Sequence, residues 1–303
     1  MHYFLRLPLD EDSPSLTIDR QRFSLLKSSK AILIEALEFE EEYEMMISNY
    51  IDLEKESLNA SISYGVLHRR EHADFFDARL ALNRRLLNLL TSVRLYNDKL
   101  NSHCCACLPE ETGIKERVES LRITEYERNF DYRFMDALRN YVQHRGTAVH
   151  HTMFGRRLAS PRKIDSLVEI YSSFSADKEV LASDSHFKKQ VLDEMPDKVD
   201  LVSASRGYIE SLSSIHINVR QMTTRSVNEA RSRIQEAIDN YRAVYKKDFV
   251  VLHAYLFDEE TSIDDISLFL NWDDIRIHLQ QRNKQLRNLK KSYVTGQVQK
   301  REY

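Results

Sequence analysis

The sequence predicts a mainly α-helical protein, a helical bundle with long helices and a small β element in its C-terminal half. Long stretches repeat apolar residues at the three- and four-residue spacing of an amphipathic helix. Only 6 of the 303 residues are glycine and 5 are proline, which leaves little material for a fold rich in tight turns. The stretch from Phe249 to Phe257 is instead enriched in valine, tyrosine and phenylalanine, which favour strands.

The first half of the chain is predicted to form one short strand followed by helices. Gly65 is expected to break the first helix, and Pro109 and Gly113 mark the end of the second. The second helix carries an apolar stripe broad enough for bundle packing, formed by Leu82, Leu86, Leu89, Leu90 and Val93. The predicted elements are an extended piece over 3–7 and helices over about 18–63, 73–102, 114–121 and 124–129.

A further helix is predicted from about Tyr132 to Arg145, with a glycine after it as the end signal. It contains the one set of residues that suggests chemistry. Its apolar positions are expected to face the core, so the polar positions are expected to be exposed. On a helix of about 3.6 residues per turn, Asp136, Asn140 and His144 stack one turn apart, and Arg139 lies one position before Asn140.

This combination of side chains suits the chemistry of a phosphodiester. A guanidinium donates two hydrogen bonds at once to a phosphate, and an imidazole with a pKa of roughly 6.5 transfers protons near neutral pH. Arg139 and His144 are separated by about 140° around the helix, so a single copy does not form a compact site. Two copies that meet across a two-fold axis would form one, which predicts a homodimer.

Arg139, Asn140 and His144 resemble the signature of the HEPN superfamily, in which an arginine, usually followed by a polar residue, precedes a histidine by a few positions on a helix. The resemblance covers about residues 74–154. Many members of that family are metal-independent ribonucleases, built as helical bundles that dimerise so that two motifs form one cleft. The resemblance implies that Arg139 and His144 are catalytic and that Asn140 supports them.

The resemblance also implies a mechanism and partners. Arg139 would hold the scissile phosphate, and His144 would deprotonate or orient a ribose 2′-hydroxyl, so that attack leaves a 2′,3′-cyclic phosphate without a metal or cofactor. Asn140 would position the phosphate or fix the imidazole, and Asp136 could orient a neighbouring arginine. The expected partners are RNA, a second copy of the chain and an antitoxin or other regulatory protein, in phage defence or a toxin–antitoxin response.

Charge is distributed unevenly along a chain whose net charge is only −3, which argues against indiscriminate binding of nucleic acid. No acidic residue occurs from Ala137 through Ile164. The candidate phosphate contacts of this segment are Arg145, His150, His151, Arg156, Arg157, Arg162 and Lys163. A second basic stretch runs from Ile275 to Arg301, and the compensating acid lies mainly between Glu35 and Glu56. Alternatively, these faces attract each other or only keep the protein in solution.

The chain is predicted to divide into a HEPN-like bundle (1–157) and a long-helix region (158–303), which could still pack as one body. Gly155, Ser160 and Pro161 suggest the boundary because they favour loops. A β-hairpin over 249–257 and 266–270 needs further strands for stability, and the N-terminal strand or the piece after Pro161 could supply them. The other expected elements are an extended piece over 164–173 and helices over 185–194, 200–246 and 272 to about 293.

The predicted helix over 200–246 contains an apolar seam with alternating three- and four-residue spacing, as in coiled coils and bundles. The seam comprises Val202, Ser205, Ile209, Leu212, His216 and Val219. It either holds a dimer together or packs inside the chain. His216 within the seam is expected to be a core histidine with satisfied hydrogen bonds rather than a ligand.

Three cysteines lie together in the segment His103-Cys104-Cys105-Ala106-Cys107. An odd number does not make a disulfide framework, and no second cysteine pair exists to complete a tetrahedral zinc site. We therefore expect reduced thiols and neither a metal nor a cofactor. The chain shows no apolar leader and no uncharged apolar run of about 18 residues, so we expect a cytoplasmic protein without a membrane partner.

Two other interpretations compete with the ribonuclease. One is a catalytically silent helical module that binds RNA or a protein partner through its basic faces, since a fold can persist without its chemistry. The other is a structural helical assembly held by the seam, with no role in nucleic-acid binding. The choice of RNA substrate depends on the shape of the site and is not encoded in a linear motif.

Overall fold

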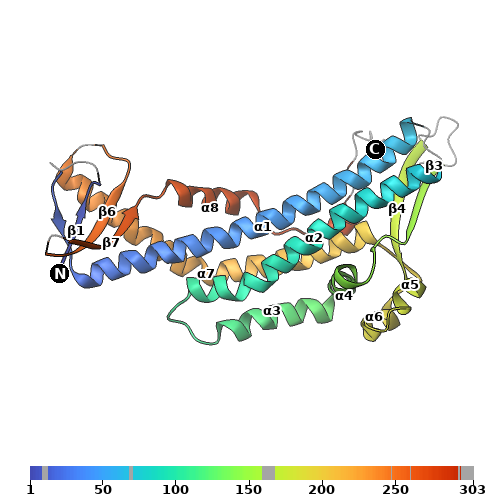
Figure 1. Ribbon diagram of the computed structural model, residues 1–303, viewed down its shortest axis with the longest axis horizontal. Coiled ribbons are helices and arrows are strands. Elements are labelled where there is room, and N and C mark those ends of the chain that lie inside the picture. Colours follow the sequence, from blue (N-terminus) through green and yellow to red (C-terminus); the bar gives the residue numbers. More distant parts are fainter. Residues whose placement is uncertain are drawn as a thin grey trace, which may run out of the picture. The chain divides into compact units, whose positions relative to one another are not determined.

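The computed structural model describes residues 1–8, 13–67, 71–158, 168–246, 248–259, 261–292 and 294. It confirms a mainly helical protein with small antiparallel sheets. Three long helices dominate the fold: α1 (Arg20–Val66), α2 (His72–Cys107) and α7 (Leu201–Tyr245) (Figure 1). Within the described ranges, none of the helices is both long and apolar enough to cross a bilayer.

The chain forms two compact units, and each of the three long helices contributes to both. Unit 1 comprises Met1–Glu44, Asn97–Val118 and Ile217–Lys284, and unit 2 comprises Met45–Tyr96, Glu119–His216 and Gln285–Tyr303. Neither unit is a continuous half of the chain. The division into 1–157 and 158–303 stays a prediction, and its boundary residues Ser160 and Pro161 lie outside the described residues.

Unit 1 contains a four-stranded antiparallel sheet in the order β2-β1-β6-β7. The predicted hairpin is formed by β6 (Leu252–Asp258) and β7 (Thr261–Leu268), although Glu260 of the predicted turn lies outside the described residues. The N-terminal strand β1 (His2–Arg6) pairs with β6, and β2 (Leu16–Thr17) completes the edge. The structure thus confirms the hairpin and one of its two predicted partners.

The core of unit 1 lies between this sheet and the helices that cover it. Fully buried members include Leu26, Leu33, Ala230, Tyr241, Leu252 and Ala254. Burial of one such leucine contributes about 1.5–3 kcal/mol relative to leaving it exposed, so these residues are a main source of favourable free energy for the unit. The last helix of the unit, α8 (Asn271–Arg282), ends well before the predicted residue 293.

Unit 2 contains a three-stranded antiparallel sheet formed by β3 (His151–Leu158), β4 (Val168–Asp177) and β5 (Lys198–Asp200). The expectation that Gly155 starts a loop is wrong, because it lies inside β3 opposite Tyr171. A Cβ atom at this position would lie 2.3 Å from the Tyr171 ring, so the glycine makes room for a cross-strand aromatic side chain.

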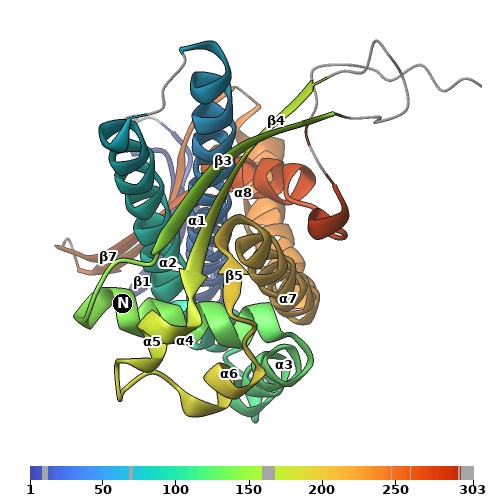
Figure 2. The ribbon, with the colours of Figure 1, turned by 90° about the vertical axis from the view of Figure 1, so that its right-hand side faces the viewer.

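The sheet of unit 2 packs against the C-terminal part of α1 (Figure 2). Ser61 and Ser172 share a hydrogen bond of 2.8 Å, and the rings of Tyr64 and Phe154 stack at 4.9 Å. Gly65 was expected to break α1, but the helix continues through it to Val66. The missing side chain is what lets Ile170 of the sheet approach, since a Cβ at Gly65 would lie 2.6 Å from its Cδ1.

Two other helix predictions need correction. A single helix, α3 (Ile114–Arg128), replaces the two short helices expected over 114–129, and Thr124 is accommodated in it because its hydroxyl donates a hydrogen bond to the carbonyl of Ser120. In place of one helix over 185–194, the chain forms α5 (Lys178–Ala182) and α6 (Lys189–Glu194), with a loop between them.

The apolar seam of α7 packs inside the chain, which excludes it as an exposed dimer surface. Ser205, Ile209, Leu212, His216 and Val219 are buried, and Val202 is half-buried. His216 has no exposed surface, and its Nδ1 shares a hydrogen bond of 3.1 Å with the hydroxyl of Tyr96. The expectation of a satisfied core histidine is therefore confirmed.

Candidate functional site

The motif lies on α4 (Phe130–His144), as the sequence predicts, in unit 2. Asn129 caps the helix because its side chain accepts a hydrogen bond from the backbone N–H of Asp131 at 3.0 Å. The buried face of the helix anchors it in the core through Tyr132, Phe134, Met135, Ala137 and Leu138. The opposite face is left for polar contacts.

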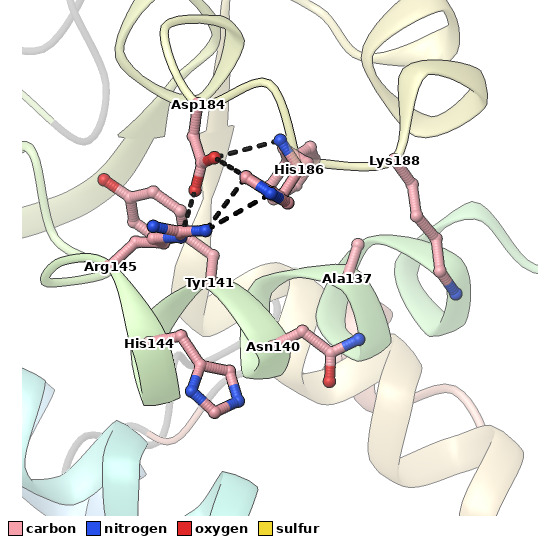
Figure 3. Close-up of a pocket in the computed structure, with 9 residues that line it drawn as sticks. Ala137, Asn140, Tyr141, His144, Arg145, Asp184, His186 and Lys188 are labelled. Atoms are coloured by element: carbon pink, nitrogen blue, oxygen red, sulfur yellow. Dashed lines mark hydrogen bonds and ion pairs between the residues drawn. The ribbon is translucent and has the colours of Figure 1, made fainter.

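A cavity of about 170 Å³ lies between α4 and the loop that joins α5 to α6. The helix and its C-cap supply Ala137, Asn140, Tyr141, His144 and Arg145, whose spacing places them on one helical face (Figure 3). The loop supplies Asp184, His186, Phe187 and Lys188. Two of the three motif residues, Asn140 and His144, therefore meet in one site, together with ionisable groups from a different part of the chain.

Arg139 does not line this cavity. Its side chain is buried, with only 7% of the residue exposed. Nη2 donates a hydrogen bond of 2.9 Å to Oδ1 of Asn140 and lies 3.6 Å from Oδ1 of Asp136. The expectation of four polar groups on one exposed face is thus wrong for Arg139, because it lies one turn after Met135 on the face that packs into the core.

Asp136 links Arg139 to the cavity. Its second carboxylate oxygen accepts a hydrogen bond of 2.9 Å from the ammonium of Lys188. Burial lowers the pKa of Lys188, but the hydrogen bond and charge of Asp136 outweigh burial and raise this pKa above its ordinary value. Lys188 also lies over the ring of Tyr126, at 5.1 Å. The cavity therefore contains an ammonium that is charged at neutral pH and paired with Asp136.

Arg145, Asp184 and His186 form a cluster on one side of the cavity (Figure 3). Oδ1 of Asp184 lies 3.1 Å from Nδ1 of His186, and Oδ2 lies 3.5 Å from Nε of Arg145. Nη2 of Arg145 lies 2.9 Å from the same Nδ1. The pKa of Asp184 is lowered, first by a hydrogen bond from the backbone N–H of His186 and then by the His186 and Arg145 side chains.

His144 and Asn140 lie together along the other side of the cavity, and both are exposed (Figure 3). Tyr141 lies behind them, packed edge-to-face against Phe187 at 6.2 Å. Burial raises the pKa of Tyr141, so its phenol stays protonated at neutral pH. The arrangement presents an exposed imidazole and an amide opposite a guanidinium, an ammonium, a carboxylate and a second imidazole.

The other predicted RNA contacts are not gathered around this cavity. His150 accepts a hydrogen bond from the backbone N–H of Asp177 through Nδ1, and burial lowers its pKa. His151 is exposed on β3 and lines a separate cavity of about 260 Å³ with His150. Arg157 is paired with Glu169, at 2.6 and 3.1 Å, and Arg156 lies over the ring of Tyr64. Arg162 and Lys163 lie outside the described residues.

Several cations of the second basic stretch are paired with carboxylates of the same chain. Arg276 is buried and paired with Asp273, and Lys290 donates to Asp131 at 2.7 Å. Arg282 pairs with Glu44 at 2.5 Å. For these residues the structure agrees with the alternative interpretation, in which basic side chains attract acidic side chains of the same chain. Lys300 and Arg301 lie outside the described residues.

The cysteines do not assemble a soft metal site with His103. Burial raises the pKa of Cys104 to about 11 and that of Cys107 to about 12, so both stay protonated thiols. His103 instead contacts carboxylates, with Nδ1 2.7 Å from Glu35 and Nε2 3.3 Å from Glu42. Its ligand atoms lie within 4.8 Å of those of Glu35 and Glu38, the one such potential cation-binding group among the described residues.

The sequence interpretation missed the four loop residues of the cavity. The expectation of one helix over 185–194 would direct these side chains along a helical face. The run Ala182-Ser183-Asp184-Ser185-His186 carries a loop signal, because serine and aspartate bond their own backbone and compete with helix. These residues predict a loop, but they do not predict that the loop lies beside α4.

Comparison with known proteins does not assign the chain to a family. No family model, no curated protein and no solved structure matches the chain. The resemblance to the HEPN superfamily therefore rests on the motif and its helical setting.

Proposed function

We propose that the protein is a metal-independent endoribonuclease of the HEPN type, with its active site in the cavity between α4 and the α5–α6 loop. The observation that carries the proposal is the meeting of His144 and Asn140 with Arg145, His186 and Lys188 in one cavity. Cleavage of RNA through the 2′-hydroxyl requires a proton acceptor and cations that stabilise charge on the phosphate, and these side chains provide both.

In this proposal His144 is the general base. Its exposed imidazole removes the proton from a ribose 2′-hydroxyl, and the 2′-oxygen attacks the adjacent phosphorus. Arg145 and Lys188 stabilise the charge that develops on the phosphate oxygens. The products are a 2′,3′-cyclic phosphate and a 5′-hydroxyl.

The burial of Arg139 favours a supporting role in place of the direct phosphate contact that the resemblance implies. Oδ1 of Asn140 accepts from Arg139, so the amide N–H groups of Asn140 are left to donate to a ligand. Through Asp136, Arg139 also fixes the position of Lys188. The motif arginine would then act on the substrate through its neighbours.

The proposal retains the homodimer. Beside α4 lies an apolar cavity of about 580 Å³, and Leu80 and Leu87 of α2 are exposed next to Val142 of the motif helix. A second copy that covers these side chains would bring two motifs together. RNA as the substrate, a regulatory partner such as an antitoxin, and a role in phage defence or a toxin–antitoxin response belong to the same proposal.

The proposal is tested with purified wild type and four variants on labelled single-stranded RNA and total transfer RNA in EDTA. His144→Ala and Arg145→Ala remove groups in the cavity. His2→Ala and Arg225→Ala remove the same residue types at exposed positions outside it. We expect the first pair to slow cleavage by about 100-fold or more and the second pair to cleave at the wild-type rate.

Two outcomes separate the competing interpretations. RNA binding that weakens with salt but is never followed by cleavage would favour the catalytically silent module. Absence of both binding and cleavage, even at low salt, would favour a structural assembly.

A further inference from the structure

The proposed reaction requires a second proton transfer that His144 does not provide. When the bond between phosphorus and the 5′-oxygen breaks, the leaving oxygen must receive a proton, because an alkoxide is a poor leaving group in water. His144 is accepting the 2′-hydroxyl proton in the same displacement. The cavity must therefore contain a separate proton donor.

Four of the ionisable groups in the cavity are poorly suited to that task. The pKa of Lys188 is raised by Asp136 and that of Tyr141 is raised by burial, so each releases its proton less readily than usual. The pKa of Asp184 is lowered, so this carboxyl group carries no proton at neutral pH. A guanidinium does not give up a proton in proteins, which excludes Arg145 as the donor. His186 is the group that remains.

We propose that His186 is the general acid that protonates the 5′-oxygen, an inference that rests on the proposed ribonuclease function. Its imidazole lines the same cavity as His144 but comes from the α5–α6 loop, on the opposite side (Figure 3). In a phosphoryl displacement, the attacking and leaving oxygens lie roughly in line on opposite sides of the phosphorus. A base on α4 and an acid on the α5–α6 loop would supply one proton-transfer group from each wall of the cavity.

The neighbours of His186 provide a partner for the ring in both protonation states. When the ring is protonated, Nδ1–H donates to the carboxylate of Asp184, at 3.1 Å. Nη2 of Arg145 lies 3.4 Å from Nε2 but is itself a donor, so Nε2–H can donate to the leaving oxygen. When the ring is neutral, Nδ1 accepts from Nη2 of Arg145, at 2.9 Å. Asp184 and Arg145 are thus positioning residues for a ring that must both hold and release a proton.

The proton balance of the step closes without a further reactant. A neutral His144 takes the 2′-hydroxyl proton, the 2′-oxygen forms a bond to phosphorus, and the bond from phosphorus to the 5′-oxygen breaks. The imidazolium of His186 gives its proton to that oxygen, so the products are a 2′,3′-cyclic phosphate and a 5′-hydroxyl. His144 ends protonated and His186 neutral, and exchange with water restores both.

A substrate with sulfur in place of the bridging 5′-oxygen tests the assignment, because a thiolate leaves without a proton. We expect His186→Ala to slow cleavage of ordinary RNA by about 10²- to 10⁴-fold and to cleave the sulfur-bridged RNA at close to the wild-type rate. His144→Ala should stay slow on both substrates, since the base is still required. His2→Ala, which removes an exposed histidine of β1 outside the cavity, serves as the control. His186 is exposed, so its replacement is not expected to impair folding, which circular dichroism checks.

Three results would overturn the assignment. Equal slowing of His186→Ala on both substrates would make His186 a binding or structural residue. A wild-type rate for His186→Ala on ordinary RNA would remove it from the reaction while leaving the proposed function intact. Wild type that cleaves neither substrate would reject the ribonuclease proposal and, with it, the role of His186.

Discussion

Arg139 donates a hydrogen bond from Nη2 to Oδ1 of Asn140, its immediate neighbour in the motif, at 2.9 Å. The two residues therefore have different surroundings, since Asn140 is exposed at the cavity and Arg139 is buried behind it. The buried guanidinium of Arg139 also contacts Asp136, so it supports the side chains of the site without lining the cavity itself. Although the two residues are adjacent in sequence, Arg139 is placed for a structural role and Asn140 for contact with a ligand.

Replacing Arg139 is expected to reduce stability as well as activity. Arg139→Ala leaves Asp136 and Asn140 without a buried partner, so we predict a loss of about 2 kcal/mol in the free energy of unfolding, measured with urea. Arg225→Ala removes an exposed arginine of α7 whose partner Glu229 is also exposed, and it should leave stability nearly unchanged. Lost cleavage with unchanged stability in Arg139→Ala would instead indicate that the guanidinium contacts the substrate.

Glu40 and Arg220 form a buried pair in unit 1. The carboxylate accepts hydrogen bonds of 2.8 and 2.6 Å from Nε and Nη2 of Arg220. Glu40→Gln replaces one acceptor with a donor that faces a guanidinium, so we predict a loss of about 3 kcal/mol in the free energy of unfolding. Glu41→Gln changes the exposed neighbour and is the matched control. Equal stability of the two variants would contradict this account of the pair.

The cysteines are expected to react at different rates. Buried Cys104 and Cys107 have pKa values raised to about 11 and 12, whereas Cys105 is half-buried. At pH 8 a disulfide reagent should therefore modify Cys105 first and the other two slowly. Because the raised pKa values favour the folded state only while the thiols are protonated, their contribution is complete below about pH 9 and is lost as the pH rises towards 11 and 12. Three equally fast thiols would contradict the prediction.

The proposed dimer is expected to depend on the apolar surface beside α4. Light scattering should give the mass of a dimer for wild type at micromolar concentration. Leu80→Glu should give the mass of a monomer and should cleave RNA more slowly. Ile263→Glu places the same charge at an exposed apolar position on β7 and should leave the dimer intact. A monomeric wild type would count against a site built from two copies.

The sequence predicts correctly those helices and strands that depend on a long pattern of neighbouring residues. The apolar spacing predicts α1, α2, α4 and α7, and strand-forming residues predict the hairpin of β6 and β7. The sequence does not predict local structure that depends on pairing with another strand. Gly155, for example, lies in a strand and not in a loop, and the ring of Tyr171 on the neighbouring strand covers it.

The same limit applies to the site. Sequence spacing brought Asn140 and His144 together because both lie on one helical face. It did not predict that Arg139 is buried, because the buried face of α4 includes Met135 and extends to Arg139, one turn later. Nor did it predict His186 and Lys188, whose place beside α4 is set by tertiary contacts between segments more than 40 residues apart.

The most direct test of the central claim is the identity of the RNA ends that wild type and His144→Ala leave after incubation with single-stranded RNA in EDTA. The account predicts 2′,3′-cyclic phosphate and 5′-hydroxyl ends with wild type and intact RNA with His144→Ala. Intact RNA with the wild-type dimer, or the same products from both proteins, would contradict it.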